Sequence, residues 1–184
     1  MKALRLSLRS VPGLGPFLRS EEGAASIPAV FWMPFFVMMM VASVEMCLLG
    51  VKQTLLDRGV DLTTRILRLG VATMPSHEQI KRSICGNIAF LPDCMTDLAV
   101  EVFQVDRATW SSDVNGRGVL CSDAITETDK PVIQPGVSGQ LMILRACLRV
   151  SPMEKLNPLS QALAQDADGR YALITTTAFV NEPK

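Results

Sequence analysis

The sequence has no excess of charge of either sign: 18 Lys and Arg residues balance 18 Asp and Glu residues in a chain of 184 residues. Without a basic field to attract phosphates, a nucleic-acid partner is not expected. His77 is the only histidine, and no two cysteines have the CxxC spacing of a zinc site. The G-x-S-x-G motif of serine hydrolases is missing as well. These absences point away from nucleic-acid-binding proteins and from common catalytic and metal sites.

Few residues remain as candidates for catalysis. His77 and Cys85, eight residues apart, are conceivable as a Cys–His nucleophile pair, but nothing in the sequence supplies a third group to orient them. We therefore expect no cofactor or metal site and predict that the protein is not an enzyme. Four acids that could be imagined as catalytic pairs are predicted to be solvated on the surface: Asp93, Asp97, Glu101 and Asp106.

Charge is also missing from one long stretch near the N-terminus. No charged residue occurs from Gly23 to Val44, and Glu45 is followed by a second uncharged run that ends at Lys52. A bilayer core about 30 Å thick needs roughly 20 apolar residues at a helical rise of ~1.5 Å. We therefore predict a transmembrane helix over residues 24–50. Glu45 lies near its far end and is predicted to be an interfacial charge.

A cleaved signal peptide is the alternative interpretation of this stretch. Basic residues precede it, and Val41-Ala42-Ser43 has the small residues of a cleavage site. However, the apolar run is much longer than the ~7–15 residues of a signal-peptide core. Pro28 and Pro34 are expected to kink the helix, which a membrane helix tolerates because neighbouring groups satisfy the freed carbonyls. We therefore favour a retained membrane span.

The helical pattern continues beyond the apolar run. Residues 51–70 have apolar side chains at three- and four-residue steps, which is typical of an amphipathic helix, and Gly70 is a plausible end. One helix from about Ala24 to Leu69 is therefore expected, with its second half packed on a domain. The predicted apolar stripe consists of Val51, Leu55, Leu56, Val60, Thr63, Ile66 and Leu67.

Residues 71–184 have the pattern of a small α+β domain. Ser76 and Gln79 have the spacing of a capping box at the start of a short helix, and a second short helix is predicted from Asn157. Residues 111–139 have the turn chemistry of a long surface loop. The fold class is thus α+β, with a long N-terminal helix packed on a small antiparallel sheet. The strands are predicted over residues 97–105, 139–150 and 170–180.

Four cysteines lie in this domain, and a fifth, Cys47, lies in the apolar run. An even number in a domain of about 110 residues suits two disulfides, which persist in an oxidising compartment such as the periplasm. Three pairings are open; we favour the local closure of Cys85 with Cys94, which leaves Cys121 to join Cys147. A zinc site is the alternative for these residues. Basic residues flank the span evenly, so the cysteines decide the predicted topology, with a cytoplasmic N-terminus and a periplasmic domain.

A basic leader, an acidic pair and the sequence Gly23-Ala24-Ala25-Ser26-Ile27 precede the long apolar span and its amphipathic continuation. This arrangement, best over the first 70 residues, resembles the TadE-like pilus assembly family, pilin-like proteins of the bacterial tight-adherence (Flp-type) pilus. The resemblance implies a pilin-like fold and a cytoplasmic leader, residues 1–23, that a prepilin peptidase cuts between Gly23 and Ala24. It also implies anchoring in the inner membrane by one helix, which contacts lipid and binds other pilus assembly proteins or pilin-like subunits.

One position departs from the family pattern. The family commonly has a glutamate five residues after the cut, where this chain has Pro28. We expect a pilin-like component or assembly factor of a Tad-type pilus. One alternative is an uncleaved bitopic membrane protein whose periplasmic domain is a binding module with a pocket, unrelated to pili. Another is a tethered enzyme, which needs titratable groups that converge in a cleft.

Overall fold

Helix α2, Ser26–Arg68, is the longest element of the computed structural model, which describes residues 26–69, 75–88, 93–121, 133–153 and 162–182. The expected long N-terminal helix is thus confirmed. Pro28 stands in the first turn of the described helix, where its missing N–H removes no helical hydrogen bond, and Pro34 lies in the interior. The chain divides into two compact units, Met1–Val41 and Ala42–Lys184, with the boundary inside α2.

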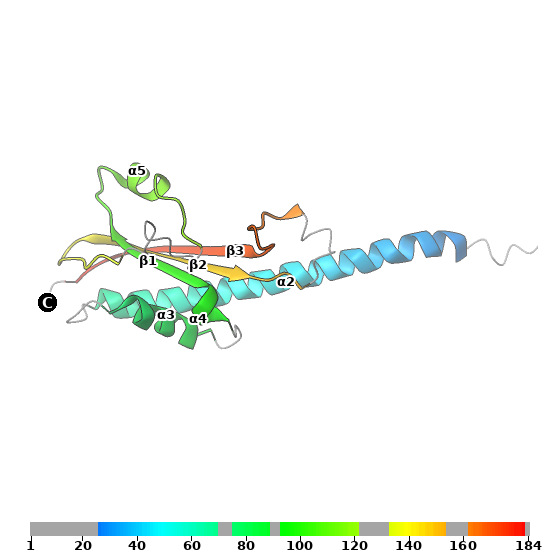
Figure 1. The fold of residues 1–184 in the computed structure, drawn as a ribbon, viewed down its shortest axis with the longest axis horizontal. Helices are drawn as coiled ribbons and strands as arrows, with labels where there is room; N and C mark the ends of the chain where they lie inside the picture. The colour runs from blue at the N-terminus through cyan, green and yellow to red at the C-terminus, as the bar shows by residue number, and fades with distance from the viewer. Residues whose placement is uncertain (1–25, 70–74, 89–92, 122–132, 154–161, 183–184) are drawn as a thin grey trace, which may run out of the picture. The chain divides into compact units, whose positions relative to one another are not determined.

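The second unit contains a three-stranded antiparallel sheet with strand order β1-β2-β3 (Figure 1). The predicted fold class of a long helix with a small antiparallel sheet is confirmed, and the strand bounds lie close to the predicted ones. The strands are β1 Leu98–Gln104, β2 Leu141–Val150 and β3 Tyr171–Val180. The remaining helices are α3 His77–Gly86, α4 Cys94–Asp97 and α5 Trp110–Asn115.

Two local predictions have different outcomes. The capping box at the start of α3 is confirmed: the Gln79 backbone N–H donates to the Ser76 hydroxyl at 3.4 Å, and the Ser76 N–H donates to the Gln79 side chain at 2.8 Å. The loop predicted over residues 111–139 is wrong at its start, because α5 forms there. The helix predicted from Asn157 begins outside the described residues.

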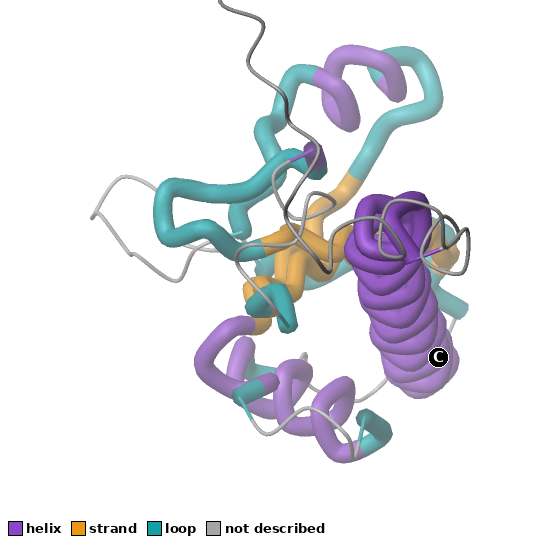
Figure 2. Tube along the Cα trace, turned by 90° about the vertical axis from the view of Figure 1, so that its right-hand side faces the viewer, coloured by secondary structure: helices purple, strands orange, loops and turns teal. Residues whose placement is uncertain are grey.

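The main core lies between one face of the sheet and the helices α2 and α3, whereas α5 lies on the opposite side of the sheet (Figure 2). Leu98 pairs with Leu148 and Leu148 with Leu173, so these side chains share the face toward α2 and α3. On the other face, a smaller cluster joins the sheet to Val114 of α5. The helix residues of the main core are Leu56, Val60, Leu67, Ile80, Ile84 and Ile88.

The buried stripe of α2 is narrower than the sequence predicts. Leu55 is half-buried, but Val51 and Ile66, both assigned to the stripe, are 50% and 55% exposed. The sheet covers only one side of the helix. Residues at the margins of the apolar stripe, which repeats every 3.6 residues, therefore face outward. The predicted stripe residues that are buried are Leu56, Val60, Thr63 and Leu67.

Strand β3 runs alongside the second half of α2 in the same direction. At one end, the Tyr171 hydroxyl donates to the Glu45 carboxylate at 3.1 Å. At the other, Arg68 forms an ion pair with Glu182 at 3.2 Å. Between them, Gln53 donates to the carbonyl of Ile174 at 3.2 Å. The two lengths match, because the helical and extended segments between these contacts both span about 35 Å.

Gly59 allows α2 and α3 to approach closely. A Cβ atom at this position would lie 3.1 Å from the Ile84 carbonyl oxygen and 3.1 Å from Cγ1 of Ile88. We expect Gly59→Leu to destabilise the domain by about 1–3 kcal/mol through overpacking. Urea unfolding of the full chain in detergent, followed by pulse proteolysis, measures the change. Gly50→Leu is the matched control, because Gly50 lies in the same helix with nothing within 4 Å; an equal loss in both variants would contradict the explanation.

Two disulfides connect the elements of the domain. Cys85 of α3 is bonded to Cys94 of α4, with a Cα–Cα distance of 5.8 Å. Cys121, which follows α5, is bonded to Cys147 of β2, with a Cα–Cα distance of 5.0 Å. This is the pairing favoured from the sequence, and it leaves Cys47 as the free thiol. Because all four thiols of the domain are in disulfides, they are not available as zinc ligands.

Candidate functional site: the apolar helix and the end of the domain

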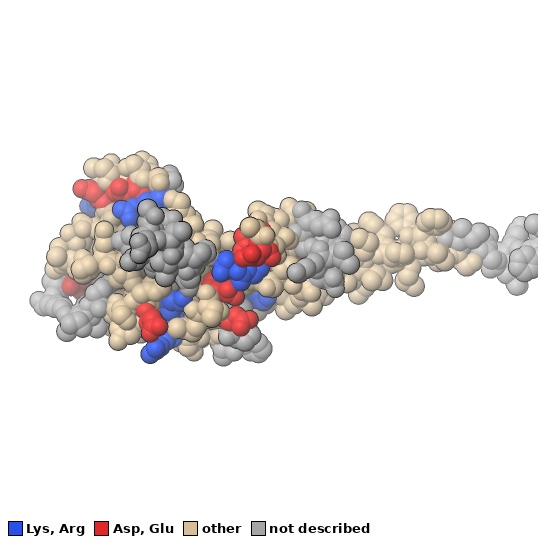
Figure 3. All heavy atoms as spheres, in the orientation of Figure 1, with Lys and Arg blue, Asp and Glu red and all other residues tan. Residues whose placement is uncertain are grey.

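The part of α2 in the first unit has an apolar surface on all sides. Among the described residues, α2 is the one helix long and apolar enough to cross a membrane. Consecutive side chains point all round a helix, and Phe31, Trp32 and Met33 are 79%, 59% and 66% exposed. Figure 3 shows no acidic or basic side chain on the described part of this unit. An apolar surface of this extent is typical of a contact with lipid or with another apolar helix.

The predicted processing site lies outside the described part of the chain. Gly23 and Ala24 precede Ser26, the first described residue, so the cut between them stays a prediction. Residues 28–41, which follow the predicted cut, are helical and exposed.

Glu45 is shielded from solvent by the domain, and its predicted position at the membrane surface stays a prediction. Its side chain is buried in the second unit, with only 2% of the residue exposed. The hydroxyl of Tyr171, the first residue of β3, donates a hydrogen bond to Glu45 Oε1 at 3.1 Å. The partner is distant in sequence, so no local pattern predicts this contact. The domain therefore covers the one charge that would interrupt the apolar surface of the helix.

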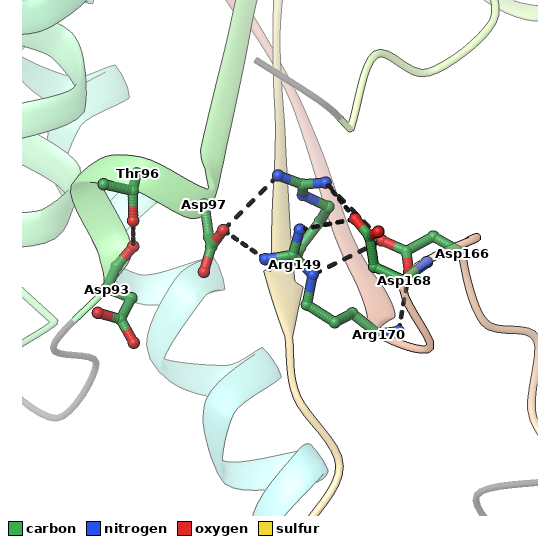
Figure 4. Close-up of polar contacts among 7 residues, drawn as sticks. All are labelled: Asp93, Thr96, Asp97, Arg149, Asp166, Asp168 and Arg170. Atoms are coloured by element: carbon green, nitrogen blue, oxygen red, sulfur yellow. Dashed lines mark hydrogen bonds and ion pairs between the residues drawn. The ribbon is translucent and has the colours of Figure 1, made fainter. Parts of the chain in front are cut away.

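Five charged side chains form a cluster close to the start of β3 (Figure 4). Asp97, at the end of α4, accepts a hydrogen bond from Arg170 at 2.7 Å and lies 3.7 Å from an Arg149 nitrogen. On the other side of the two guanidinium groups, Asp168 lies 3.2 Å from Arg170 and 3.6 Å from Arg149. We call Asp97, Arg149, Asp166, Asp168 and Arg170 the arginine–aspartate cluster.

Asp166 organises the turn that leads into β3. Its Oδ1 atom accepts hydrogen bonds from the backbone N–H groups of Asp168 at 2.9 Å and Arg170 at 2.8 Å. The hydrogen bond from the Arg170 backbone is the main reason why the pKa of Asp166 lies below its ordinary value. Gly169, with φ of 74°, completes the turn in a conformation that favours glycine. The turn thus fixes the charged side chains at the beginning of the strand.

The arginine–aspartate cluster borders a surface pocket of about 300 Å³. Arg149, Asp166 and Asp168 line it together with Cys121. The charged groups are already paired with one another, and Cys121 is held in a disulfide. Among the described residues, no group of three or more His, Cys, Asp or Glu side chains is arranged to hold a metal ion. The ion pairs of the cluster join α4, β2 and the turn before β3, which come from distant parts of the sequence.

No protein-family model, curated protein or solved structure matches this chain. Its function is therefore inferred from its own apolar helix, its domain and the contacts described above.

The other sequence candidates do not converge on a catalytic site. Cys85 is in a disulfide and has no thiol for a Cys–His pair, and His77 lies half-buried in the first turn of α3. Asp93 and Asp106 are exposed, as predicted. Asp97 is not a freely solvated acid, because it is paired with arginine in the arginine–aspartate cluster.

Glu101 was predicted at the surface, and this prediction is wrong: it is only 7% exposed. It lies on the face of β1 covered by α5 and is 3.9 Å from the buried guanidinium group of Arg145. Burial raises the pKa of Glu101, while the nearby charges of Arg145 and Arg117 oppose that increase. The alternation in β1 gave a hint, because Glu101 falls on the same face as Phe103, which packs under α5.

Proposed function

We propose that this chain is a pilin-like component or assembly factor of a Tad-type (Flp-type) pilus, anchored in a bacterial inner membrane by α2. The observation that carries the proposal is that a single helix has two roles. Its first half is apolar and exposed, and its second half forms one layer of a small α+β domain. The resemblance of the first 70 residues to the TadE-like family supports the same assignment.

The proposed topology places the N-terminus in the cytoplasm and the domain in the periplasm. Its support is the pair of disulfides, Cys85–Cys94 and Cys121–Cys147, since disulfides persist in oxidising compartments. The proposed partners are membrane lipid and other pilus assembly proteins or pilin-like subunits, which contact the apolar part of α2. We propose a structural role without catalysis, consistent with charged groups that are paired internally.

The proposal is tested by the N-terminal mass of the protein purified from its native membrane. A start at Ala24 is expected, because residues 1–23 are proposed to be the leader removed by a prepilin peptidase. In the Gly23→Leu variant, the bulky side chain is expected to block the cut and leave a start at Met1. Gly15→Leu, a substitution inside the leader, is the matched control and should be processed normally.

Two results would contradict the pilin-like assignment. A start at Met1 in the unmodified protein would show that no leader is removed. Appearance of the shortened form in the Gly23→Leu variant would show that any cut falls at another site. Each result leaves the membrane anchor intact, because the apolar helix is present in both forms.

The second candidate is an uncleaved bitopic membrane protein whose domain is a binding module unrelated to pili. The pocket of about 300 Å³ beside the arginine–aspartate cluster is the observation in its favour. A start at Met1 would favour this candidate. We rank it second, because Arg149, which lines the pocket, is already in ion pairs with Asp166 and Asp168, the two acids that line it.

A further inference from the structure

The apolar exposed surface of α2 does not end where the domain begins. In the second unit, Val44, Met46, Leu48 and Val51 are 52%, 52%, 38% and 50% exposed. Cys47 is exposed as well. These residues lie on both sides of Glu45 in the sequence, and together they extend the surface without exposed charge by two further turns of the helix.

Glu45 does not interrupt this surface, because its carboxylate points into the domain. The residue is 2% exposed and accepts a hydrogen bond from Tyr171, which is itself only 4% exposed. The next charged residue, Lys52, is half-buried, and the first exposed charges are Asp57 and Arg58. A boundary between lipid and water is therefore expected near Val51, rather than at the first charge in the sequence.

The length of the helix supports the same boundary. From Ser26 to Val51 the helix carries no exposed charge, and a helix of this length spans about 39 Å at 1.5 Å per residue. The hydrocarbon core is about 30 Å thick, and the bilayer including its headgroup regions about 40–45 Å. The excess can be taken up by tilt or by entry into the headgroup region.

We propose that lipid covers α2 as far as Val51, so that the Glu45–Tyr171 contact lies inside the headgroup region and the domain sits directly on the bilayer. The inference rests on the proposed membrane anchoring. It adds that the start of β3 faces lipid headgroups, and that the hydrogen bond from Tyr171 allows a carboxylate to be placed at that depth. The partner of this end of the domain is thus the membrane itself.

Cys47 provides the test, because it is the free thiol of the chain and lies between Glu45 and Val51. The full-length protein in right-side-out membrane vesicles is treated with a charged, membrane-impermeant maleimide. The matched control is Cys47→Ala/Arg58→Cys, which moves the thiol along the same helix to an exposed, charged position. We expect Cys47 to react about tenfold more slowly than the control thiol, since lipid excludes the reagent, and detergent to remove the difference. Equal rates in vesicles would overturn the inference.

A second measurement distinguishes lipid from a neighbouring copy of the chain. Bimane attached to Cys47 is reconstituted in vesicles that contain phospholipids brominated near the glycerol end of the acyl chain. Quenching is expected if lipid covers this position. Absence of quenching, together with cross-linking of two Cys47 thiols by a bis-maleimide, would overturn the inference in favour of a second copy.

A separate experiment tests the proposed membrane anchor. Extraction of the native membranes with alkaline carbonate should leave the protein in the pellet. Release into the supernatant would overturn the membrane anchor, whatever the reactivity of Cys47. Retention in the pellet with a fast-reacting Cys47 would overturn only the inference about the boundary.

Discussion

Replacing Arg145 with methionine is expected to destabilise the domain by about 3–5 kcal/mol at neutral pH. The guanidinium group lies 3.9 Å from the Glu101 carboxylate and also donates to the carbonyls of Val114 and Arg117, at 3.0 and 3.2 Å. It packs over the ring of Phe103 with a distance of 5.5 Å to the centroid. Removal of the arginine leaves the Glu101 carboxylate buried without this ion-pair partner and removes two hydrogen bonds to backbone carbonyls. Leaving one charge of a buried ion pair without its partner is strongly destabilising.

The destabilisation caused by Arg145→Met should become smaller as the pH falls. Burial already raises the pKa of Glu101, and Arg145 opposes this, so the variant should have an even higher folded pKa. When the pKa of a carboxyl group is higher in the folded than in the unfolded state, the folded state binds the proton more tightly. The free energy of unfolding therefore increases as the pH falls through the folded pKa. Pulse proteolysis in urea, at neutral pH and at about pH 5, measures the difference for the full chain in detergent.

A double variant is the matched control for this prediction. Arg145→Met with Glu101→Leu removes both charges and should recover most of the lost stability, because a buried ion pair can be replaced by apolar groups of similar size. A single-variant loss below about 1 kcal/mol, or a loss independent of pH, would contradict the role assigned to the pair.

Loss of the Cys121–Cys147 disulfide is expected to cost about 3.5 kcal/mol in the chain-entropy model. The bond closes a loop with a sequence separation of 26 residues and fixes the segment after α5 on the central strand β2. The change is made as Cys121→Ala/Cys147→Ala. Urea unfolding of the oxidised full chain measures the free energy of unfolding against the unmodified protein.

The second disulfide supplies the comparison. Cys85–Cys94 closes a loop with a separation of 9 residues, so Cys85→Ala/Cys94→Ala should cost less, about 2.6 kcal/mol. The result to examine is which variant loses more stability, since each variant replaces two cysteines and removes one disulfide. A larger loss for the shorter loop would show that local packing, and not loop closure, determines the stabilisation.

The long helix and the three strands were predictable because their signals are local. The apolar run and the repeat at three and four residues predict α2, and the Ser76–Gln79 spacing predicts the start of α3. The positive φ angles of Gly139 and Gly169 fit the turns that introduce β2 and β3. Each of these features is decided by residues within a few positions of one another.

The charged contacts were not predictable for the opposite reason. Glu45 meets Tyr171, and Asp97 meets Arg170, across 126 and 73 positions of the chain. A single sequence shows the charges of Glu45 and Glu101 but not the partners that permit their burial. Helix α5 was missed because a helix of 6 residues in a segment rich in turn residues has little periodicity to recognise.

The alignment of α2 with β3 has a mechanical consequence. A pull on α2 along its axis is transmitted to β3, which runs in the same direction and contacts the helix near both ends of the strand. Strand β3 pairs with β2 from Tyr171 to Val180, so such a force shears the ladder and loads its hydrogen bonds together. A force across the sheet would open the same bonds one after another. The pairing of β2 with β3 therefore resists tension directed along α2.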